Sequence, residues 1–152
     1  MLWRPATRTD VPAVVALLAD DSLGATRETA DPAPYLAAFD AMAAEAANHL
    51  IVAEDHGRIV ATYQITFISG LSLRAARRAQ VESVRVAADL RGRGIGAALM
   101  ADAMSRARAA GCSLMQLTTN KTRTRAHAFY DGLGFTASHI GYKRDLELHP
   151  GD

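Results

Sequence analysis

The most informative run of residues is Val84-Arg85-Val86-Ala87-Ala88-Asp89-Leu90-Arg91-Gly92-Arg93-Gly94-Ile95-Gly96-Ala97. The alternating, β-branched pattern of residues 80–86 predicts a strand, and residues 95–110, closed by a glycine, predict a long helix. Glycines between them let backbone N–H groups converge, and the first helical turn adds unpaired donors and the positive end of the helix dipole. Arg91 and Arg93 add charge. The run therefore predicts a site for a doubly charged anion such as a pyrophosphate.

Three classes of phosphate-binding turn compete for this pattern. A P-loop requires Gly-Lys-Ser/Thr at the helix start, and Ala97-Ala98 stands there instead, which excludes that class. The dinucleotide fingerprint formally fits residues 92–97, but it requires an acidic residue about 20 positions on. Residues 111–128 contain no Asp or Glu, and the 56 residues after Gly96 are too few for the rest of a nicotinamide enzyme. The third class is a coenzyme A pyrophosphate site; a flexible turn with solvated arginines is the non-binding alternative.

The patterns on either side of the glycine run predict one α/β domain, residues 1–152, with a mixed central sheet. The expected order is β-α-α-β-β-β-α-β-α-β-β, with about 6–7 strands flanked by about four helices. The strands are expected at residues 2–6, 50–53, 59–68, 80–86, 114–118, 135–140 and 142–148, the last two antiparallel. The helices are expected to begin near residues 10, 31, 95 and 124.

The composition is that of an ordinary globular domain, with 49% hydrophobic and 22% charged residues. A net charge of +1 calls for neither nucleic acid nor an anionic membrane. Charges interrupt every apolar segment before about 18 residues, and the N-terminus is strand-like rather than a signal peptide. The single cysteine, Cys112, forms no internal disulfide, and the five histidines lack ligand spacing, so no metal site is expected. The expected setting is cytoplasmic.

A second motif lies downstream and reads Ala126-His127-Ala128-Phe129-Tyr130-Asp131-Gly132-Leu133-Gly134-Phe135. With Arg91-Gly92-Arg93-Gly94-Ile95-Gly96 directly after a strand, it makes the chain resemble the GNAT superfamily of N-acetyltransferases over nearly its whole length. Residues 116–130 and 138–139 are more weakly similar to the aminoalkylphosphonate acetyltransferase subgroup. The resemblance implies a GNAT-like fold, acetyl-CoA as co-substrate, and acetyl transfer to the primary amine of a small molecule by direct attack. Dimerisation is common in the family, so a homodimer is compatible with it.

The chemistry requires a base and an acid, because only about one alkyl amine in a thousand is uncharged at neutral pH. The resemblance points to Tyr130 as the acid that protonates the leaving thiolate, and packing beside Phe129 and Leu133 is the structural alternative. Glu82 is the candidate base, because a carboxylate inside a strand is costly unless it is paired or functional. A water relay, an ion pair with an arginine and simple exposure are the alternatives.

The resemblance also implies the contacts with the co-substrate. Backbone groups at the end of strand 80–86 would bind the oxyanion and the pantetheine arm, which requires strand 114–118 to diverge. In that strand Gln80, Glu82, Val84 and Val86 are expected to share a face. Many relatives carry an asparagine where Arg123 stands here, so either Asn120 takes that role from a longer loop or the role is lost. The expected contacts are Val84, Arg85, Val86, Arg91, Gly92, Arg93, Gly94, Ile95, Gly96, Asn120, Phe129 and Tyr130.

Two other functions remain open at this point. One is acetylation of a protein N-terminus or lysine. The other is a non-catalytic acyl-CoA-binding regulatory module, which would keep residues 91–96 but would have no need of Tyr130 and Glu82.

Overall fold

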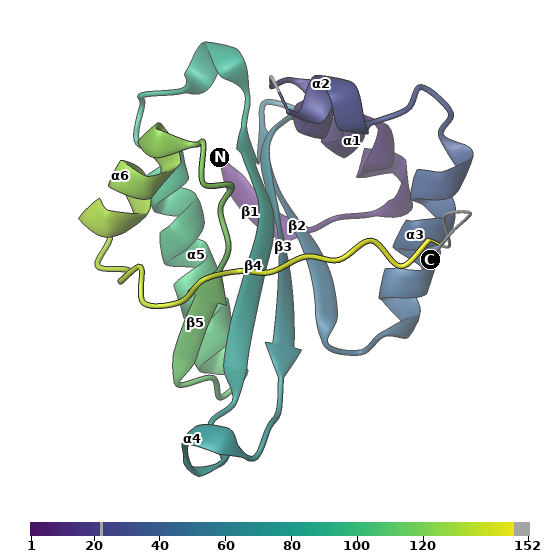
Figure 1. Ribbon diagram of the computed structural model, residues 1–152. Helices are drawn as coiled ribbons and strands as arrows, with labels where there is room; N and C mark the ends of the chain where they lie inside the picture. Colours follow the sequence, from purple (N-terminus) through teal and green to yellow (C-terminus); the bar gives the residue numbers. More distant parts are fainter. Residues whose placement is uncertain (22, 148–152) are drawn as a thin grey trace. The chain divides into compact units, whose positions relative to one another are not determined.

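The computed structural model describes residues 1–21 and 23–147, and the chain divides into two compact units, Met1–Leu117 and Thr118–Asp152. The first unit is a sheet with helices on both faces: α1, α2 and α3 lie on one side and α5 on the other (Figure 1). Its elements are β1 (Leu2–Pro5), α1 (Val11–Ala19), α2 (Gly24–Arg27), α3 (Ala33–Ala44), β2 (Asn48–Asp55), β3 (Arg58–Ile68), α4 (Ser72–Ala75), β4 (Arg78–Val86), α5 (Ile95–Ala109) and β5 (Leu114–Leu117).

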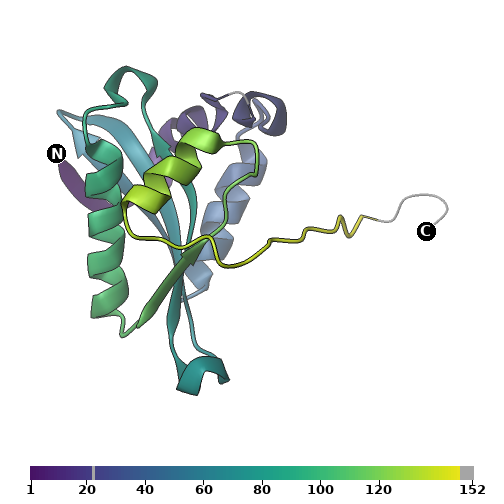
Figure 2. The same ribbon diagram turned by 60° about the vertical axis from the view of Figure 1, so that its left-hand side comes forward.

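The five strands follow one another across the sheet in the order β1-β2-β3-β4-β5. All neighbours are antiparallel except β4 and β5, which are parallel and joined by the crossover helix α5. Figure 2 shows α5 lying along its face of the sheet. The β2–β3 turn has positive φ at both His56 and Gly57, 48° and 79°, which is the backbone that a tight hairpin needs. The mixed sheet is therefore confirmed, and the strands expected at residues 50–53 and 59–68 form a hairpin.

The core lies mainly between the sheet and α5. Tyr63 and Ile65 of β3 and Leu99, Met100 and Ala103 of α5 are all 0% exposed. The spacing of the three α5 residues places them on one stripe of the helix, as the sequence pattern requires. The opposite face of the sheet is covered by α1, which buries Val11, Val14 and Leu17 less completely. A cavity lies between α1, α3 and this face of the sheet.

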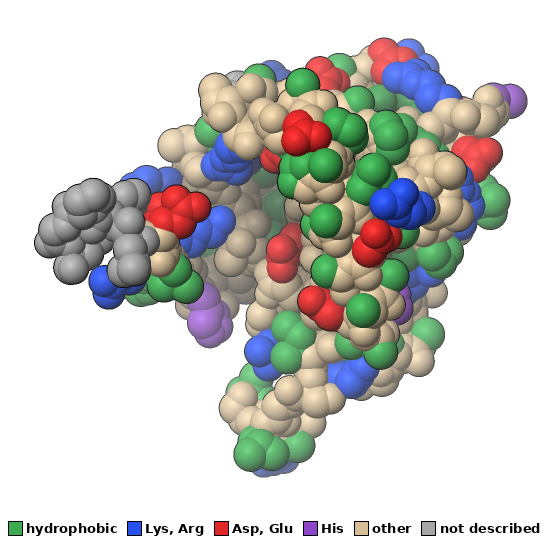
Figure 3. Space-filling view, turned by 90° about the vertical axis from the view of Figure 1, so that its right-hand side faces the viewer, with side chains coloured by type: hydrophobic (Ala, Val, Ile, Leu, Met, Phe, Trp, Pro, Cys, Tyr) green, Lys and Arg blue, Asp and Glu red, His purple; other side chains and the backbone are tan. Residues whose placement is uncertain are grey.

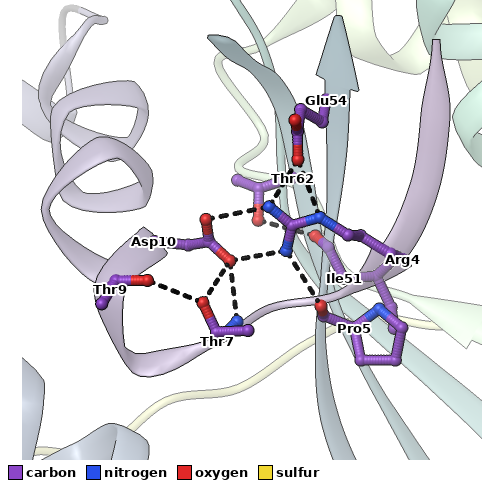
Figure 4. A network of polar contacts seen from close by, with 8 residues as sticks. All are labelled: Arg4, Pro5, Thr7, Thr9, Asp10, Ile51, Glu54 and Thr62. Atoms are coloured by element: carbon purple, nitrogen blue, oxygen red, sulfur yellow. Dashed lines mark hydrogen bonds and ion pairs between the residues drawn. The ribbon is translucent and has the colours of Figure 1, made fainter. Parts of the chain in front are cut away.

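A polar network holds the N-terminal strand to the start of α1 (Figure 4). The Arg4 guanidinium donates to both carboxylate oxygens of Asp10, at 2.7 and 3.1 Å, and to Oε2 of Glu54 at 2.7 and 2.9 Å. Asp10 Oδ2 also accepts the backbone N–H of Thr7 at 2.7 Å. Asp10 is 9% exposed, and its hydrogen bonds with Arg4 lower its carboxyl pKa to about 2. The charged form of Asp10 therefore stabilises the folded chain.

β4 contains one extra residue relative to β3, and this β-bulge changes which side chains share a face. Gln64 pairs with Glu82, but Thr62 pairs with Arg85 and Ala61 with Val86. Ser83, inside the bulge, has a left-handed φ of 54°. The expectation that Gln80, Glu82, Val84 and Val86 share one face is therefore wrong, because the added residue moves Val86 to the opposite face.

The second unit contains α6 (Thr124–Gly132), which the sequence predicted. The two strands expected at residues 135–140 and 142–148 are wrong, because residues 135–147 form no strand; residue 148 lies outside the described part. The sheet consequently has five strands rather than 6–7. Two short helices, α2 and α4, form in segments where no helix was expected, so the described residues contain six α-helices rather than about four. An alternating pattern predicts a strand but supplies no partner for its hydrogen bonds.

The longest helix in the described part is α5, with 15 residues. Across residues 1–21 and 23–147, no helix combines the length and the hydrophobicity needed to span a membrane.

Candidate active site

The glycine turn presents an open set of backbone donors at the start of α5. Gly92 and Gly94 have φ values of 76° and 78°, in the left-handed region that favours glycine. A Cβ added at either residue would meet no atom within 4 Å, so the space above the turn is open. Gly94 is the N-cap of α5 and no side chain caps the helix, which leaves the N–H groups of Ile95, Gly96 and Ala97 for a ligand.

The two arginines of the turn have different roles. Arg91 Nε donates to the carbonyl of Val86 at 3.1 Å, and its Nη2 donates to the carbonyl of Asp20 at 3.0 Å. Arg91 therefore ties the turn to the ends of β4 and α1. Arg93 is exposed, and among the described residues its guanidinium has no hydrogen bond. Of the predicted pair, Arg93 is the one whose charge is available to an anion.

The carboxylate just before the turn is hydrogen-bonded to an arginine outside the turn. Asp89, just before the turn, forms a two-point ion pair with Arg58, both N–O distances being 2.8 Å. The hydrogen bond with Arg58 lowers the pKa of Asp89 to about 2, so this carboxylate stays ionised and paired. The donor set fits a pyrophosphate: converging amides, open space above them and one adjacent guanidinium.

The end of β4 has a free backbone edge next to the glycine turn. β5 pairs with β4 only from Arg78 to Val81, whose partner Leu117 ends β5. Within the first unit, Glu82–Val86 therefore has no strand on that side, as the expected divergence of strand 114–118 requires. The carbonyl of Val84 accepts Nη1 of Arg85 at 2.9 Å, while the N–H groups of this edge are the donors predicted for an oxyanion.

Glu82 is exposed on β4, directly opposite Gln64. Arg85, which is near Glu82 in β4, has its Nε 3.0 Å from Asp21 Oδ2. Arg77 Nη1 donates to Ser69 Oγ at 2.8 Å, and its guanidinium lies 5.9 Å from the ring centre of Phe67. Simple exposure and a catalytic role both remain compatible with Glu82.

The other predicted site residues belong to the second unit. Tyr130 of α6 is half-buried in an aromatic cluster, with ring centres 5.1 Å from Phe129 and 5.7 Å from Phe135. Asn120 Oδ1 accepts the N–H and the hydroxyl of Thr122, at 3.0 and 2.7 Å, in a turn that precedes α6. The Asn120 oxygen is therefore hydrogen-bonded locally, and the Tyr130 ring packs against neighbouring rings. The glycine turn and Glu82 both belong to the first unit, whereas Asn120, Phe129 and Tyr130 belong to the second.

A cavity that was not predicted from the sequence opens beside the β-bulge. It lies between α1, α3 and the sheet, has a volume of about 110 Å³, and includes Thr62, Gln64 and Ser83. The sequence did contain one indication of this cavity. Polar residues stand at alternate positions of β3, on the side of the sheet opposite the core. The bulge itself had only the polar pair Glu82-Ser83, which interrupts the run of valines.

The arginine-rich loop between β3 and β4, which contains α4, projects from the end of the sheet (Figure 1). Leu71 and Leu73 in it are 93% and 72% exposed, and hydrophobic side chains gather at the lower end of the molecule in Figure 3. Arg74 there is exposed, with a left-handed φ of 60°. Among the described residues, no three His, Cys, Asp or Glu side chains come together in a way that could hold a metal ion.

Comparison with protein-family models matches residues 14–135 to the acetyltransferase (GNAT) family. An aminoalkylphosphonate N-acetyltransferase of Salmonella typhimurium is 37% identical over 67 residues, which is 44% of this chain and 44% of that protein. The chain thus spans less than half the length of this relative.

Two solved structures show the extent of the structural likeness. A transcriptional regulator from Bacillus halodurans C-125 is 42% identical, with a TM-score of 0.92 over 95% of this chain and 99% of its own. A predicted acetyltransferase from Clostridium acetobutylicum, solved with acetyl-CoA, is 18% identical, with a TM-score of 0.75 over 95% of this chain and 96% of its own. The latter likeness is one of fold.

Proposed function

The chain belongs to the acetyltransferase (GNAT) family, and on that premise we propose that it transfers the acetyl group of acetyl-CoA to the primary amine of a small molecule. The family match crosses the division at Leu117, which supports a single N-acetyltransferase domain over residues 1–152. The observation that carries the proposal is the pairing of an open, uncapped helix start with a free strand edge beside it.

The glycine turn is the proposed binding site for the pyrophosphate. The amides of Ile95 and Gly96 donate to phosphate oxygens, and Arg93 supplies charge. Gly92 and Gly94 keep side chains out of the approach. Arg91 acts by holding the turn on the carbonyl of Val86. Acetyl-CoA, once bound, supplies an activated acyl group as a thioester.

The free edge of β4 is the proposed binding site for the pantetheine arm and the reacting carbonyl. Backbone N–H groups in Val84–Val86 stabilise the negative charge that develops on the thioester oxygen when the amine attacks. Glu82, directly or through a water molecule, removes the proton from the amine. Tyr130 returns a proton to the thiolate that leaves, and Phe129 and Asn120 contact the co-substrate from the second unit. The small-molecule acceptor is supported by the distant aminoalkylphosphonate relative.

The direct test follows release of free thiol from acetyl-CoA with a panel of primary amines and lysine peptides. We expect release with small amines, and Tyr130→Phe should lower kcat by about 100-fold or more while the Kd of acetyl-CoA changes less than about twofold. Tyr142→Phe is the matched control, because that phenol is 92% exposed and should leave both quantities unchanged. An equal loss of kcat and acetyl-CoA affinity in Tyr130→Phe would make the residue structural.

A second candidate function is a regulatory module that binds acyl-CoA without turnover. The observation that favours it is the 42% identical Bacillus halodurans protein, which is described as a transcriptional regulator. Binding of acetyl-CoA with no thiol release on any acceptor, peptides included, would support this function. Release with peptides alone would assign the activity to protein amines.

A further inference from the structure

The cavity beside the β-bulge has an apolar wall and no charge. Its volume is about 110 Å³, and its lining contains no Lys, Arg, His, Asp or Glu among the described residues. Side chains of α1 and α3, among them Val15, Leu18, Phe39 and Met42, form the wall. An engineered apolar cavity of about 150 Å³ holds a benzene molecule, so this cavity accepts a group no larger than one ring.

The apolar face of α3 is not used to complete the core. Tyr35, Phe39 and Met42 share one side of the helix, yet no residue of α3 is buried. The hydroxyl of Tyr35 is already satisfied outside the cavity, since it donates to Glu28 at 2.5 Å and accepts the N–H of Thr29 at 2.9 Å. Its ring is therefore left as an apolar wall. This half-exposed surface gains burial if an apolar group enters.

The polar residues of the cavity lie on the sheet, next to the proposed base. Thr62 Oγ1 donates to the carbonyl of Ile51 at 2.9 Å, and Gln64 Nε2 donates to Asn48 Oδ1 at 2.9 Å. Glu82 is the register partner of Gln64, and residues paired across antiparallel strands share a face. An amine beside Glu82 therefore has the cavity on the same face of the sheet, within reach of its substituent.

Among the described residues of the first unit, the β4 arginines next to the cavity do not offer a cation to an anionic substituent. Arg85, the arginine nearest the bulge in β4, is paired with Asp21, and both side chains are largely buried, with 17% and 16% exposed. Arg78 lies four residues before Glu82, about 13 Å along an extended strand. A phosphonate or carboxylate entering the cavity would lose part of its hydration without gaining a charged partner from the lining.

These observations lead to a substrate class, and we infer that the acceptor is a primary amine with an uncharged, apolar substituent of about four to six heavy atoms. The inference rests on the proposed function, and it separates this chain from its aminoalkylphosphonate relative, whose acceptor carries a charged group. Val15, Phe39 and Met42 select the substituent by size, and the uncharged lining selects against anionic acceptors.

The test compares two acceptors matched in length, butylamine and 3-aminopropylphosphonate. We expect kcat/KM for butylamine to be higher by about tenfold or more, because only its end can be buried without an unpaired charge. Equal or greater activity with the phosphonate would overturn the inference while leaving the proposed function intact. Absence of thiol release with every amine would overturn both.

Two variants on one helix test the cavity itself. Ala38→Phe places a ring at the cavity, which Ala38 lines, and should raise the KM for butylamine about tenfold with the Kd of acetyl-CoA unchanged. Ala37→Phe is the matched control, because Ala37 is exposed and does not line the cavity. An unchanged KM in Ala38→Phe would contradict the inference. If that variant fails to fold, Met42→Ala enlarges the same cavity and should shift the preference from butylamine toward hexylamine; an unshifted preference would also contradict it.

Discussion

Asp10 is the residue at which charge and fold stability are most tightly coupled in this chain. It accepts a two-point contact from Arg4 and the N–H of Thr7 while being 9% exposed. Protonation of the carboxyl would weaken all of these contacts at once. Because the pKa is about 2 in the folded chain and 3.8 ordinarily, the folded state favours the charged form.

This difference predicts acid sensitivity with a defined window. Asp10 contributes about 2 kcal/mol of stability above pH 4, and this contribution is lost as the pH falls from about 4 to about 2. Asp10→Asn should therefore be less stable than wild type at pH 7, with the difference closing toward pH 2. The measurement is urea unfolding over that pH range. Asp89→Asn is the control, because Asp89 has a similarly lowered pKa but a side chain that is 58% exposed, so its effect should be much smaller.

Single residues of the candidate site differ in how well the sequence predicts them. Gly92 and Gly94 were predicted because glycines at a strand-to-helix turn have a specific backbone use, and both have positive φ. The β-bulge at Ser83 was not predicted, because a bulge depends on how two strands pair and not on the sequence of either strand alone. The different roles of Arg91 and Arg93 depend on long-range partners, such as the carbonyl of Asp20, that no local pattern reveals.

At the scale of elements, the glycine turn and the helix that follows it act as one unit. α5 packs a stripe of fully buried residues on the sheet, and this fixes the direction of its first-turn amides. The N-cap conformation at Gly94 determines where those amides begin. A residue with a Cβ can occupy the left-handed region only at a cost of about 1–2 kcal/mol.

Gly94→Ala is therefore expected to lower stability by about 1 kcal/mol and to weaken acetyl-CoA binding by about tenfold, the equivalent of one lost charge-assisted hydrogen bond. Gly57→Ala is the matched control, because Gly57 has φ of 79° in the β2–β3 turn and is equally open. It should lose similar stability without weakening the binding. Calorimetric titration with acetyl-CoA and thermal unfolding distinguish the two effects. Equal losses of affinity in both variants would mean that the turn acts only through stability.

The elements that the sequence predicted correctly have both a periodic pattern and a partner close in the chain. The β2–β3 hairpin and α5 are examples, since a two-residue turn and a buried stripe define them locally. The segment 135–147 has the alternation of a strand but no ladder, and Ile140 and Tyr142 in it are 81% and 92% exposed. An alternating pattern predicts which face of a strand is apolar, but it does not predict the neighbouring strand with which it forms hydrogen bonds.

Across the whole first unit, one buried side chain connects the two parts of the candidate site. Tyr63 stands in β3 at the position of the β-bulge, between the register pairs of Thr62 and Gln64. Its hydroxyl donates to Asp102 Oδ2 of α5 at 2.5 Å, and Arg106 Nε donates to the same oxygen at 2.8 Å. The hydrogen bond thus links the strand that frames the bulge to the helix that presents the glycine turn.

Tyr63→Phe should lower the free energy of unfolding by about 2 kcal/mol at pH 7, because it removes a buried hydrogen bond to a charged group. Burial, followed by the hydrogen bond to Asp102, raises the pKa of Tyr63 above its ordinary value of 10.0. The folded chain therefore holds this proton more tightly than the unfolded chain. Stability that is fully present below about pH 10 should be lost as the pH rises past that value.

The Phe variant has no such proton, so its unfolding free energy should depend less steeply on pH above about pH 10. Urea unfolding between about pH 8 and pH 11, on wild type and variant together, measures this difference. Tyr35→Phe is the control: its phenol pKa is also raised, by the hydrogen bond to Glu28, but the group lies at the surface and should contribute little. Identical slopes for wild type and Tyr63→Phe would show that the link between β3 and α5 does not depend on this proton.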